Sequence, residues 1–355
     1  MDLIVLNTNL EKTSILDVFE SLIWTDRYLG YGEFEVYAKA SKELLDILKD
    51  DYYLVSNDSE HVMIVEDSKI DGDGNSDNLI VTGRSLESIL DRRIIWNQTV
   101  LTGSLQNGIQ KLLNESIIAP TISDRAIPNF IFEASDDSNI INLTVETQFD
   151  MGANLYEAIK NLCLASNIGF KITLSDTNQF VFKLYSGVDR SYDQLQNPYV
   201  IFSPKFENII SSSYYHSKKS LKNVTFVMGE EIDDIGLTRK STIIGSASSI
   251  ERREIYTDAS NISQTTDEEY MSDEAYLSQL SQKGVETLAN NVVSKSFDGQ
   301  VDTTRSFKYG EDFYMGDTVQ LITDYGIEGK AMVSEMIHSQ STQETVAYPK
   351  FEMIN

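Results

Sequence analysis

Apolar and polar residues alternate strictly from Glu33 to Lys39. The apolar members of this stretch share one face, as a β-strand with one buried side requires. Other short apolar runs bounded by turn residues predict three more strands nearby: Tyr52–Ser56, His61–Glu66 and Leu79–Thr82. The first two are predicted to form a hairpin through the turn at residues 57–59. Residues 1–97 are therefore predicted to form a barrel-like β domain with short helices.

Helices are predicted where the apolar spacing changes to three and four residues. In the N-terminal part, a short helix follows the capping residue Ser41, and a longer one runs from Arg84 to Trp96 with Ser85 as its cap. Further along the chain, the same spacing predicts three more helices, of which the last is the longest: Thr102–Ser116, Asn154–Ser166 and Asp273–Val293.

The remaining pattern divides the chain after residue 97 into three further parts. Residues 98–205 predict an α+β domain, in which a strand and a helix precede a hairpin: Leu143–Phe149, Phe170–Leu174 and Phe180–Tyr185 are its strands. Residues 206–300 combine a strand over Val224–Met228 with a polar, loop-rich stretch over Gly229–Ser272, and this domain need not be continuous in sequence. Residues 301–355 return to a barrel-like set of strands: Val319–Thr323, Lys330–Ser334 and one near Phe351. The predicted fold class is α+β and β-rich, with several small domains and no repeat at a fixed period.

The charge of the chain excludes some classes of partner. The 355 residues include 55 acidic and 29 basic ones, a formal net charge of −26. Nucleic-acid phosphates and anionic membranes attract cations, so this chain has the wrong sign to bind either. The N-terminus shows no signal-peptide pattern and no stretch approaches the roughly 18 apolar residues of a membrane span, so we expect a protein made in the cytoplasm without membrane insertion.

Candidate reactive residues are few, and none forms a catalytic motif. Cys163 is the single cysteine and lies in an apolar helical pattern, which predicts a buried small hydrophobe. The three histidines are far apart in sequence and form no zinc-binding pair: His61, His216 and His338. The acidic run Glu230–Asp234 is typical of a solvated loop. We therefore predict no enzyme, no catalytic residue, no metal ligand and no cofactor, and we identify no binding residue.

Two stretches leave an alternative open. Residues Asp71 to Asp77 space oxygen ligands like a calcium loop, but Ser76 and Thr82 stand where that loop needs glycine and glutamate, so a polar turn is the favoured interpretation over a weak cation site. Four aromatic residues cluster in a short segment and either stack on sugar or fill the core of a small barrel: Trp24, Tyr28, Tyr31 and Phe34.

Several short stretches then occur in a fixed order: Leu22–Tyr28, Gly32–Val36, Ile64–Glu66, Val81–Ile94, and Phe313–Val319 followed by Gly326 and Ile327. This ordered set resembles the siphophage tail-hub, or baseplate hub, protein family, in the structural hub region of tail-associated lysin-type proteins without the lytic domain. The likeness is strongest at the two ends of the chain. The resemblance implies a homotrimer at the distal end of the tail tube of the virion, built from barrel domains like those of the tube subunit and from α+β domains.

The same resemblance implies partners and a location. Such hubs contact the distal tail protein on one side and tail-tip or fibre proteins on the other, and they assemble in the host bacterial cytoplasm. Many longer relatives carry a peptidoglycan-cleaving domain, for which we expect no counterpart here. Three copies carry 3 × (−26) = −78 formal charges, and an acidic channel wall lets viral DNA pass without specific binding. The alternatives are a carbohydrate-binding or peptidoglycan-hydrolysing tail protein and a β-rich surface adhesin.

Overall fold

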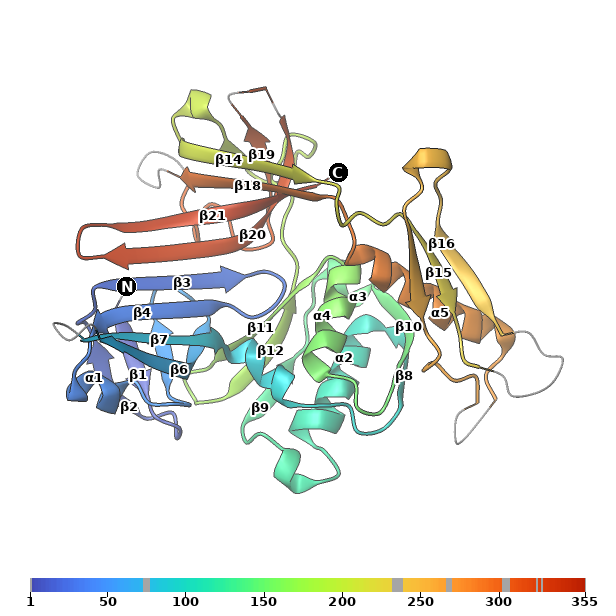
Figure 1. The fold of residues 1–355 in the computed structure, drawn as a ribbon, viewed down its shortest axis with the longest axis horizontal. Helices are drawn as coiled ribbons and strands as arrows, with labels where there is room; N and C mark the ends of the chain where they lie inside the picture. The colour runs from blue at the N-terminus through green and yellow to red at the C-terminus, as the bar shows by residue number, and fades with distance from the viewer. Residues whose placement is uncertain are drawn as a thin grey trace.

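The computed structural model describes residues 2–72, 77–231, 239–265, 270–301, 307–323, 325–326 and 328–354. Strands from both ends of the chain lie side by side in one large sheet, and the α-helices other than α1 belong to the segment between these ends (Figure 1). The β-rich α+β class predicted from the sequence is confirmed. The strand order of this sheet is an open path among the described residues, so the strands do not close into the small barrel considered for the N-terminal part.

The N-terminal part contributes seven strands and one α-helix: β1 (Leu3–Leu6), β2 (Lys12–Leu16), β3 (Ser21–Arg27), β4 (Glu33–Lys39), α1 (Lys42–Ile47), β5 (Tyr53–Ser56), β6 (Val62–Gly72) and β7 (Asp77–Ser85). The alternation in β4 buries Phe34, Val36 and Ala38 as predicted. Ser41 caps α1 by accepting a hydrogen bond from the backbone N–H of Leu44. The predicted hairpin is also confirmed, since β5 and β6 pair antiparallel.

The helix predicted from Arg84 to Trp96 is wrong in type and length. A 3₁₀ helix covers only Leu86–Arg92, and the Ser85 hydroxyl makes no capping bond. That hydroxyl instead accepts from the backbone N–H of Gly32 and donates to Glu87. One long-range hydrogen bond, from Gly32, and one local side-chain bond, to Glu87, therefore replace the capping bond that Ser85 would otherwise make.

The C-terminal part extends the same sheet with six strands: β13 (Ile201–Phe202), β14 (Ile209–Ser217), β18 (Ser294–Val301), β19 (Thr318–Ile322), β20 (Glu328–Ser341) and β21 (Thr345–Met353). The strand order is β14-β18-β21-β20-β3-β4-β7-β6-β5-β1-β2, with β19 on β20 and β13 on β19. The strand predicted over Lys330–Ser334 is the first half of the longer β20. The second half of β20 pairs antiparallel with β3, and this seam joins the two ends of the chain.

Between these parts lies an α+β region: β8 (Thr99–Ser104), α2 (Leu105–Leu113), β9 (Phe130–Glu133), α3 (Ser138–Ile141), β10 (Thr144–Phe149), α4 (Leu155–Ala165), β11 (Gly169–Leu174) and β12 (Phe180–Tyr185). The predicted order of strand, helix and hairpin is present in β10, α4, β11 and β12. The helix predicted from Thr102 begins later, because Thr102 pairs with Glu146 in the β8–β10 ladder and Ser104 caps α2. A π-helical turn over Asn114–Ile118 then continues α2.

A smaller unit follows, with β15 (Val224–Met228), β16 (Ser241–Gly245), β17 (Glu254–Asp258) and α5 (Asp273–Ala289). The prediction of a loop over Gly229–Ser272 is wrong in part, because β16 and β17 form within it and flank β15. The long helix ends at Ala289, before the predicted Val293, and Val292 beyond it is 56% exposed. In Figure 1 this unit projects from the α+β region on the side away from the large sheet.

The two ends of the chain repeat one topology. In the N-terminal half the chain passes through β3, β4, β5, β6 and β7, which lie in the order β3-β4-β7-β6-β5, all antiparallel. In the C-terminal half it passes through β14, β18, β19, β20 and β21, which lie in the order β14-β18-β21-β20-β19, again antiparallel. Each half also has a register shift at the same place, between Val65 and Asp67 in β6 and between Val333 and Glu335 in β20.

Candidate functional site

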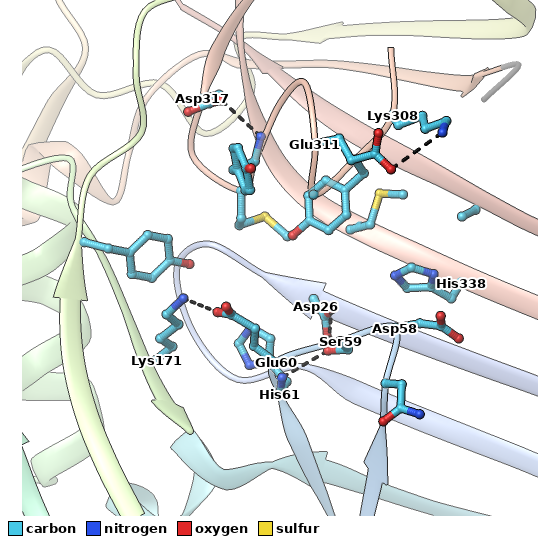
Figure 2. Close-up of a pocket in the computed structure, with 18 of the residues that line it drawn as sticks. Asp26, Asp58, Ser59, Glu60, His61, Lys171, Lys308, Glu311, Asp317 and His338 are labelled. Atoms are coloured by element: carbon cyan, nitrogen blue, oxygen red, sulfur yellow. Dashed lines mark hydrogen bonds and ion pairs between the residues drawn. The ribbon is translucent and has the colours of Figure 1, made fainter. Parts of the chain in front are cut away.

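A cleft of about 920 Å³ opens where the two halves of the large sheet meet the α+β region. The β5–β6 turn (57–61) lines one side, the segment 308–317 lines the other, and β11, β12, β20 and β21 complete the wall. Figure 2 shows ionisable side chains reaching the cleft from both sides. These residues are Asp26, Asp58, Glu60, His61, Lys171, Lys308, Glu311, Asp317 and His338.

Several of these ionisable groups are paired with partners from this same chain. Lys171 forms an ion pair with Glu60. Lys308 Nζ lies 3.5 Å from a Glu311 carboxylate oxygen. On the far wall, Arg190 Nε lies 2.6 Å from Asp317, whose other oxygen accepts from the backbone N–H of Val188 at 2.7 Å. These carboxylates therefore hold elements of the fold in place.

Asp26, at the end of β3, ties the seam strand to the β5–β6 turn. Its carboxylate accepts from the Trp24 indole N–H at 2.8 Å and from the Ser59 hydroxyl at 2.7 Å. The Ser59 oxygen in turn accepts from the backbone N–H of His61 at 3.0 Å. The Asp26 residue is only 2% exposed, so this chain of hydrogen bonds is shielded from water and fixes the turn below the cleft.

Behind the turn, His61 and Glu87 form a buried ion pair. Nδ1 of His61 lies 3.2 Å from Oε1 of Glu87, and the two side chains are 7% and 0% exposed. The Nδ1 atom makes no well-directed hydrogen bond, so the contact is mainly electrostatic. Burial alone lowers the pKa of His61, but the nearby Glu87 and Asp26 carboxylates outweigh it and raise that pKa to about 9. Burial raises the pKa of Glu87, and its partners, His61 first, hold it below its usual value.

Glu87 is the junction of four segments. Its carboxylate accepts from the backbone N–H of Ile172 in β11 at 2.7 Å and from the Ser85 hydroxyl at the end of β7. Ser85 also receives the Gly32 N–H at 2.6 Å, which adds the β3–β4 connection. With His61 as the fourth contact, one carboxylate joins the N-terminal sheet to the α+β region. Sequence reasoning missed Glu87, although a single acid within the apolar run of residues 86–90 was a usable signal.

His338 places a second histidine at the same cleft. It lies opposite Trp24 in the β20–β3 seam, and its Nε2 atom is buried without a hydrogen bond among the described residues. Burial lowers the pKa of His338, and the Asp26 and Asp58 carboxylates oppose this effect without reversing it. The structure thus brings His61 and His338 together at one cleft and leaves His216 exposed on β14.

Tyr28 lies where the N-terminal part, the C-terminal part and the α+β region meet. Its ring is 2% exposed and packs edge-on against Tyr185 at a centroid distance of 5.2 Å. A Cβ added at Gly169 or Gly316 would lie 2.5 or 2.3 Å from a carbon of this ring, so both positions need glycine. The Tyr28 hydroxyl donates to the carbonyl of Asn167 at 3.3 Å, and burial raises the pKa of Tyr28 to about 12.

The aromatic cluster is a core feature, and the sugar-stacking alternative is wrong. Trp24, Tyr28 and Phe34 are 0%, 2% and 3% exposed, so their faces are not available to a sugar ring. Tyr31 is partly buried and packs against Tyr156 at 5.1 Å. Trp24 and Phe34 pack within the core of the N-terminal part, Tyr28 lies in the core of the C-terminal part, and Tyr31 packs against the core that includes the α+β region.

The remaining candidates are Cys163, the acidic run and the calcium-like loop, of which the structure describes only a part. Cys163 is fully buried, and burial raises the pKa of its thiol well above neutral pH. In the acidic run, Glu230 accepts from Ser263 and Gln264, while Asp233 and Asp234 lie outside the described residues. In the calcium-like loop, residues 73–76 lie outside the described residues, so its cation site stays a prediction. Within the part of the chain that the structure describes, no group of three or more His, Cys, Asp or Glu side chains could hold a metal ion. No described helix has the length and apolarity needed to cross a membrane.

Solved structures of tail proteins share this fold along nearly the whole chain. The 43 kDa tail protein of prophage MuSo2 from Shewanella oneidensis gives a TM-score of 0.61 at 11% identity, covering 99% of this chain and 98% of that one. The tail protein from Neisseria meningitidis MC58 gives 0.59 at 13%, covering 99% and 96%. The prophage tail protein gp18 from Listeria monocytogenes EGD-e gives 0.58 at 13%, covering 99% and 94%. At such low identities the likeness establishes the fold alone.

No curated protein matches the chain in sequence. The sequence model described as "Siphovirus ReqiPepy6 Gp37-like protein" matches residues 2–350, almost the entire length. This match confirms the resemblance to siphophage tail proteins that the ordered stretches predicted. The chain belongs to the family of Siphovirus ReqiPepy6 Gp37-like proteins.

Proposed function

We propose that the chain is a structural subunit of a bacteriophage tail tip, and that three copies form a baseplate hub that closes or continues the tail tube. The observation that carries the proposal is the repeated topology of the two chain ends, joined through the β3–β20 seam into one sheet. One copy thus supplies two similar wall segments side by side, and a three-fold ring of such copies has six. The family membership and the tail-protein fold support the same assignment.

In this proposal the hub works through protein interfaces. The copies assemble in the host bacterial cytoplasm, bind the distal tail protein on one side and tail-tip or fibre proteins on the other, and remain in the virion. The charge of 3 × (−26) = −78 on a trimer keeps viral DNA from adhering to the channel wall. A gel-shift titration with double-stranded DNA at low salt should give no retarded band, and tight binding would contradict a passive channel.

We propose no enzymatic role. Hydrolysis of a glycan needs two carboxyl groups free to face the sugar, whereas Glu60, Glu311 and Asp317 in the cleft are engaged by basic residues of this chain. Clearing of purified host cell walls by the isolated protein would contradict this assignment.

Light scattering coupled to size-exclusion chromatography tests the trimer. The expected mass is about 120 kDa, three times 40.1 kDa, and negative-stain images should show three-fold rings with a central channel. A mass of about 40 kDa at high concentration, both alone and with the distal tail protein, would overturn the proposal.

A further inference from the structure

Several strand edges of the large sheet have no partner in the described chain, the end strand β2 among them, and two of these edges are related by the repeated topology. The first half of β6 pairs with β5 through Val62–Ile64, whereas the second half, from Asp67 to Gly72, is paired with β7 on one edge only. At one end of the sheet, β14 pairs with β18 alone among the described strands. Each edge therefore presents unpaired backbone N–H and C=O groups, which are ready to bind another strand.

The same pair of edges is already joined inside the chain. By the repeated topology, β20 corresponds to β6 and β3 corresponds to β14. The first half of β20 pairs with β19, as β6 pairs with β5, and after the register shift its second half pairs with β3 through Glu335–Ser341. The second half of β6 has the same register shift before it and, among the described strands, lacks the corresponding partner. The missing partner of β6 corresponds to β14, which one chain presents at the far end of its sheet.

We propose that β14 of one copy pairs antiparallel with the second half of β6 of the next copy, so that the sheet continues from copy to copy around the ring. The contact joins unlike edges, and a head-to-tail contact of this kind closes into a ring when the rotation between copies permits. This inference rests on the proposed hub and identifies the surface that builds it. The occupant of both edges is a second copy of this chain.

The intrachain seam also predicts the register. Residues that lie opposite one another on neighbouring strands can be followed across the sheet, starting from the first residue after each register shift. In the N-terminal half this row crosses β6, β7, β4 and β3 through Asp67, Thr82, Glu35 and Ile23. In the C-terminal half the equivalent row crosses β20, β21, β18 and β14 through Glu335, Lys350, Asp298 and Ser213. Ser213 is thus the counterpart of Ile23, which lies opposite Ser339 in the seam. Ser339 lies four residues after Glu335, and Asp71 lies four residues after Asp67. Asp71 is therefore the counterpart of Ser339. The predicted rungs between copies are Ser213 opposite Asp71, Tyr214 opposite Ile70 and Tyr215 opposite Lys69.

The side chains on these rungs suit such a contact. Tyr214 and Ile70 are 38% and 51% exposed, and the predicted register makes them a cross-strand aromatic–aliphatic pair. The corresponding intrachain position holds Trp24, and both aromatics lie opposite a buried phenylalanine, Phe297 and Phe34 respectively.

The composition of β14 fits as well. Edge strands are usually protected by charges or proline, yet β14 has neither from Ile209 to Ser217. For copies that each carry a net charge of −26, a strand without charged residues is a place where close approach costs little.

Disulfide trapping tests the register. Opposite residues of an antiparallel pair have Cα atoms about 4.5–5.5 Å apart, within the range of about 4.4–6.8 Å that a disulfide spans. The double variant Asp71→Cys/Ser213→Cys should form covalent dimers and a closed covalent trimer on mild oxidation. Cys163 is buried and remains in all variants. A second pair, Lys69→Cys/Tyr215→Cys, lies on the same predicted face and serves if the first variant folds poorly.

Matched controls separate this inference from the trimer itself. Ser68→Cys/Ser213→Cys is three residues out of register and on the other face, and we expect at least tenfold less covalent product from it. If Ser213→Cys alone links efficiently, β14 pairs with itself and the inference is wrong. A trimer by light scattering with neither cysteine pair linking refutes the β14–β6 contact and leaves the hub intact, whereas monomers throughout refute both.

Discussion

Replacing Glu87 by glutamine should cost the protein about 2–3 kcal/mol of stability at pH 7. The substitution keeps the size of the side chain, so the loss reports the charge and not a cavity. The neighbouring carboxylates raise the pKa of His61 from 6.5 to about 9, and because one pKa unit corresponds to about 1.4 kcal/mol, the protonated histidine contributes about 3 kcal/mol. At pH 7 most of that contribution is present. The expected loss of stability is smaller than the roughly 3–5 kcal/mol that follows when a buried charge is left without its partner. It is smaller because His61 can release its proton and become neutral.

Urea denaturation of the wild type and the Glu87→Gln variant measures the difference as a lower midpoint at an unchanged slope. The control is Glu60→Gln, which removes the ion pair with Lys171 where the Glu60 side chain is 71% exposed. Exposed pairs contribute about 0–1 kcal/mol, so this variant should stay close to the wild type. Equal losses in the two variants, or a loss below about 1 kcal/mol for Glu87→Gln, would show that the buried pair does not hold the regions together.

Three further predictions follow from the same contacts. The folded-state pKa of His61 lies above its unfolded value of 6.5, so its contribution to stability is complete below pH 6.5 and disappears as the pH rises through about 9. Urea denaturation should show the free energy of unfolding of the wild type falling by about 2 kcal/mol between pH 7 and 9. An equal fall in the Glu87→Gln variant would contradict this. Gly316→Ala should lower stability by about 2–4 kcal/mol, because the new Cβ would lie 2.3 Å from the Tyr28 ring and the φ of this position is +86°. Gly310→Ala is the control: its φ of +84° is similar but the space around it is open, so it should lose only about 1–2 kcal/mol. Indistinguishable melting curves for the two variants would rule out the close packing. Ile70→Glu should reduce the trimer fraction at least tenfold by light scattering, while Ile15→Glu, equally exposed at 50% but on β2, should leave it unchanged; a trimer that tolerates both places the contact elsewhere.

Local patterns predicted those elements whose own residues determine them. The alternation of β4 and the Ser41 cap of α1 depend on neighbours within a few residues, and both were predicted. Ser85 is a good capping residue by type, but its hydroxyl donates to Glu87 and accepts from Gly32, and the sequence does not show that Gly32 is nearby. β16 and β17 were missed because each is short and has only two adjacent apolar residues without a period-two pattern, and one of the two is exposed, Ile243 at 58% and Tyr256 at 55%.

The candidate site was less accessible to sequence reasoning than the fold. Its parts come from residues 26–87, 171–188 and 308–347, and only tertiary pairing brings them together. The repeat of the two halves was equally hidden, because the insertion between β14 and β18 removes any fixed period and the equivalence lies in the strand order. The domain limits proposed from the sequence stay a prediction, although the large sheet includes strands from both ends of the chain.

A cryo-electron microscopy reconstruction of the assembled protein tests the central claim most directly. We predict a three-fold ring around a channel, in which β14 of each copy is hydrogen-bonded to the second half of β6 in the next, with Tyr214 beside Ile70. A particle without a three-fold axis, or a ring in which the β14 edge faces solvent, would contradict the account.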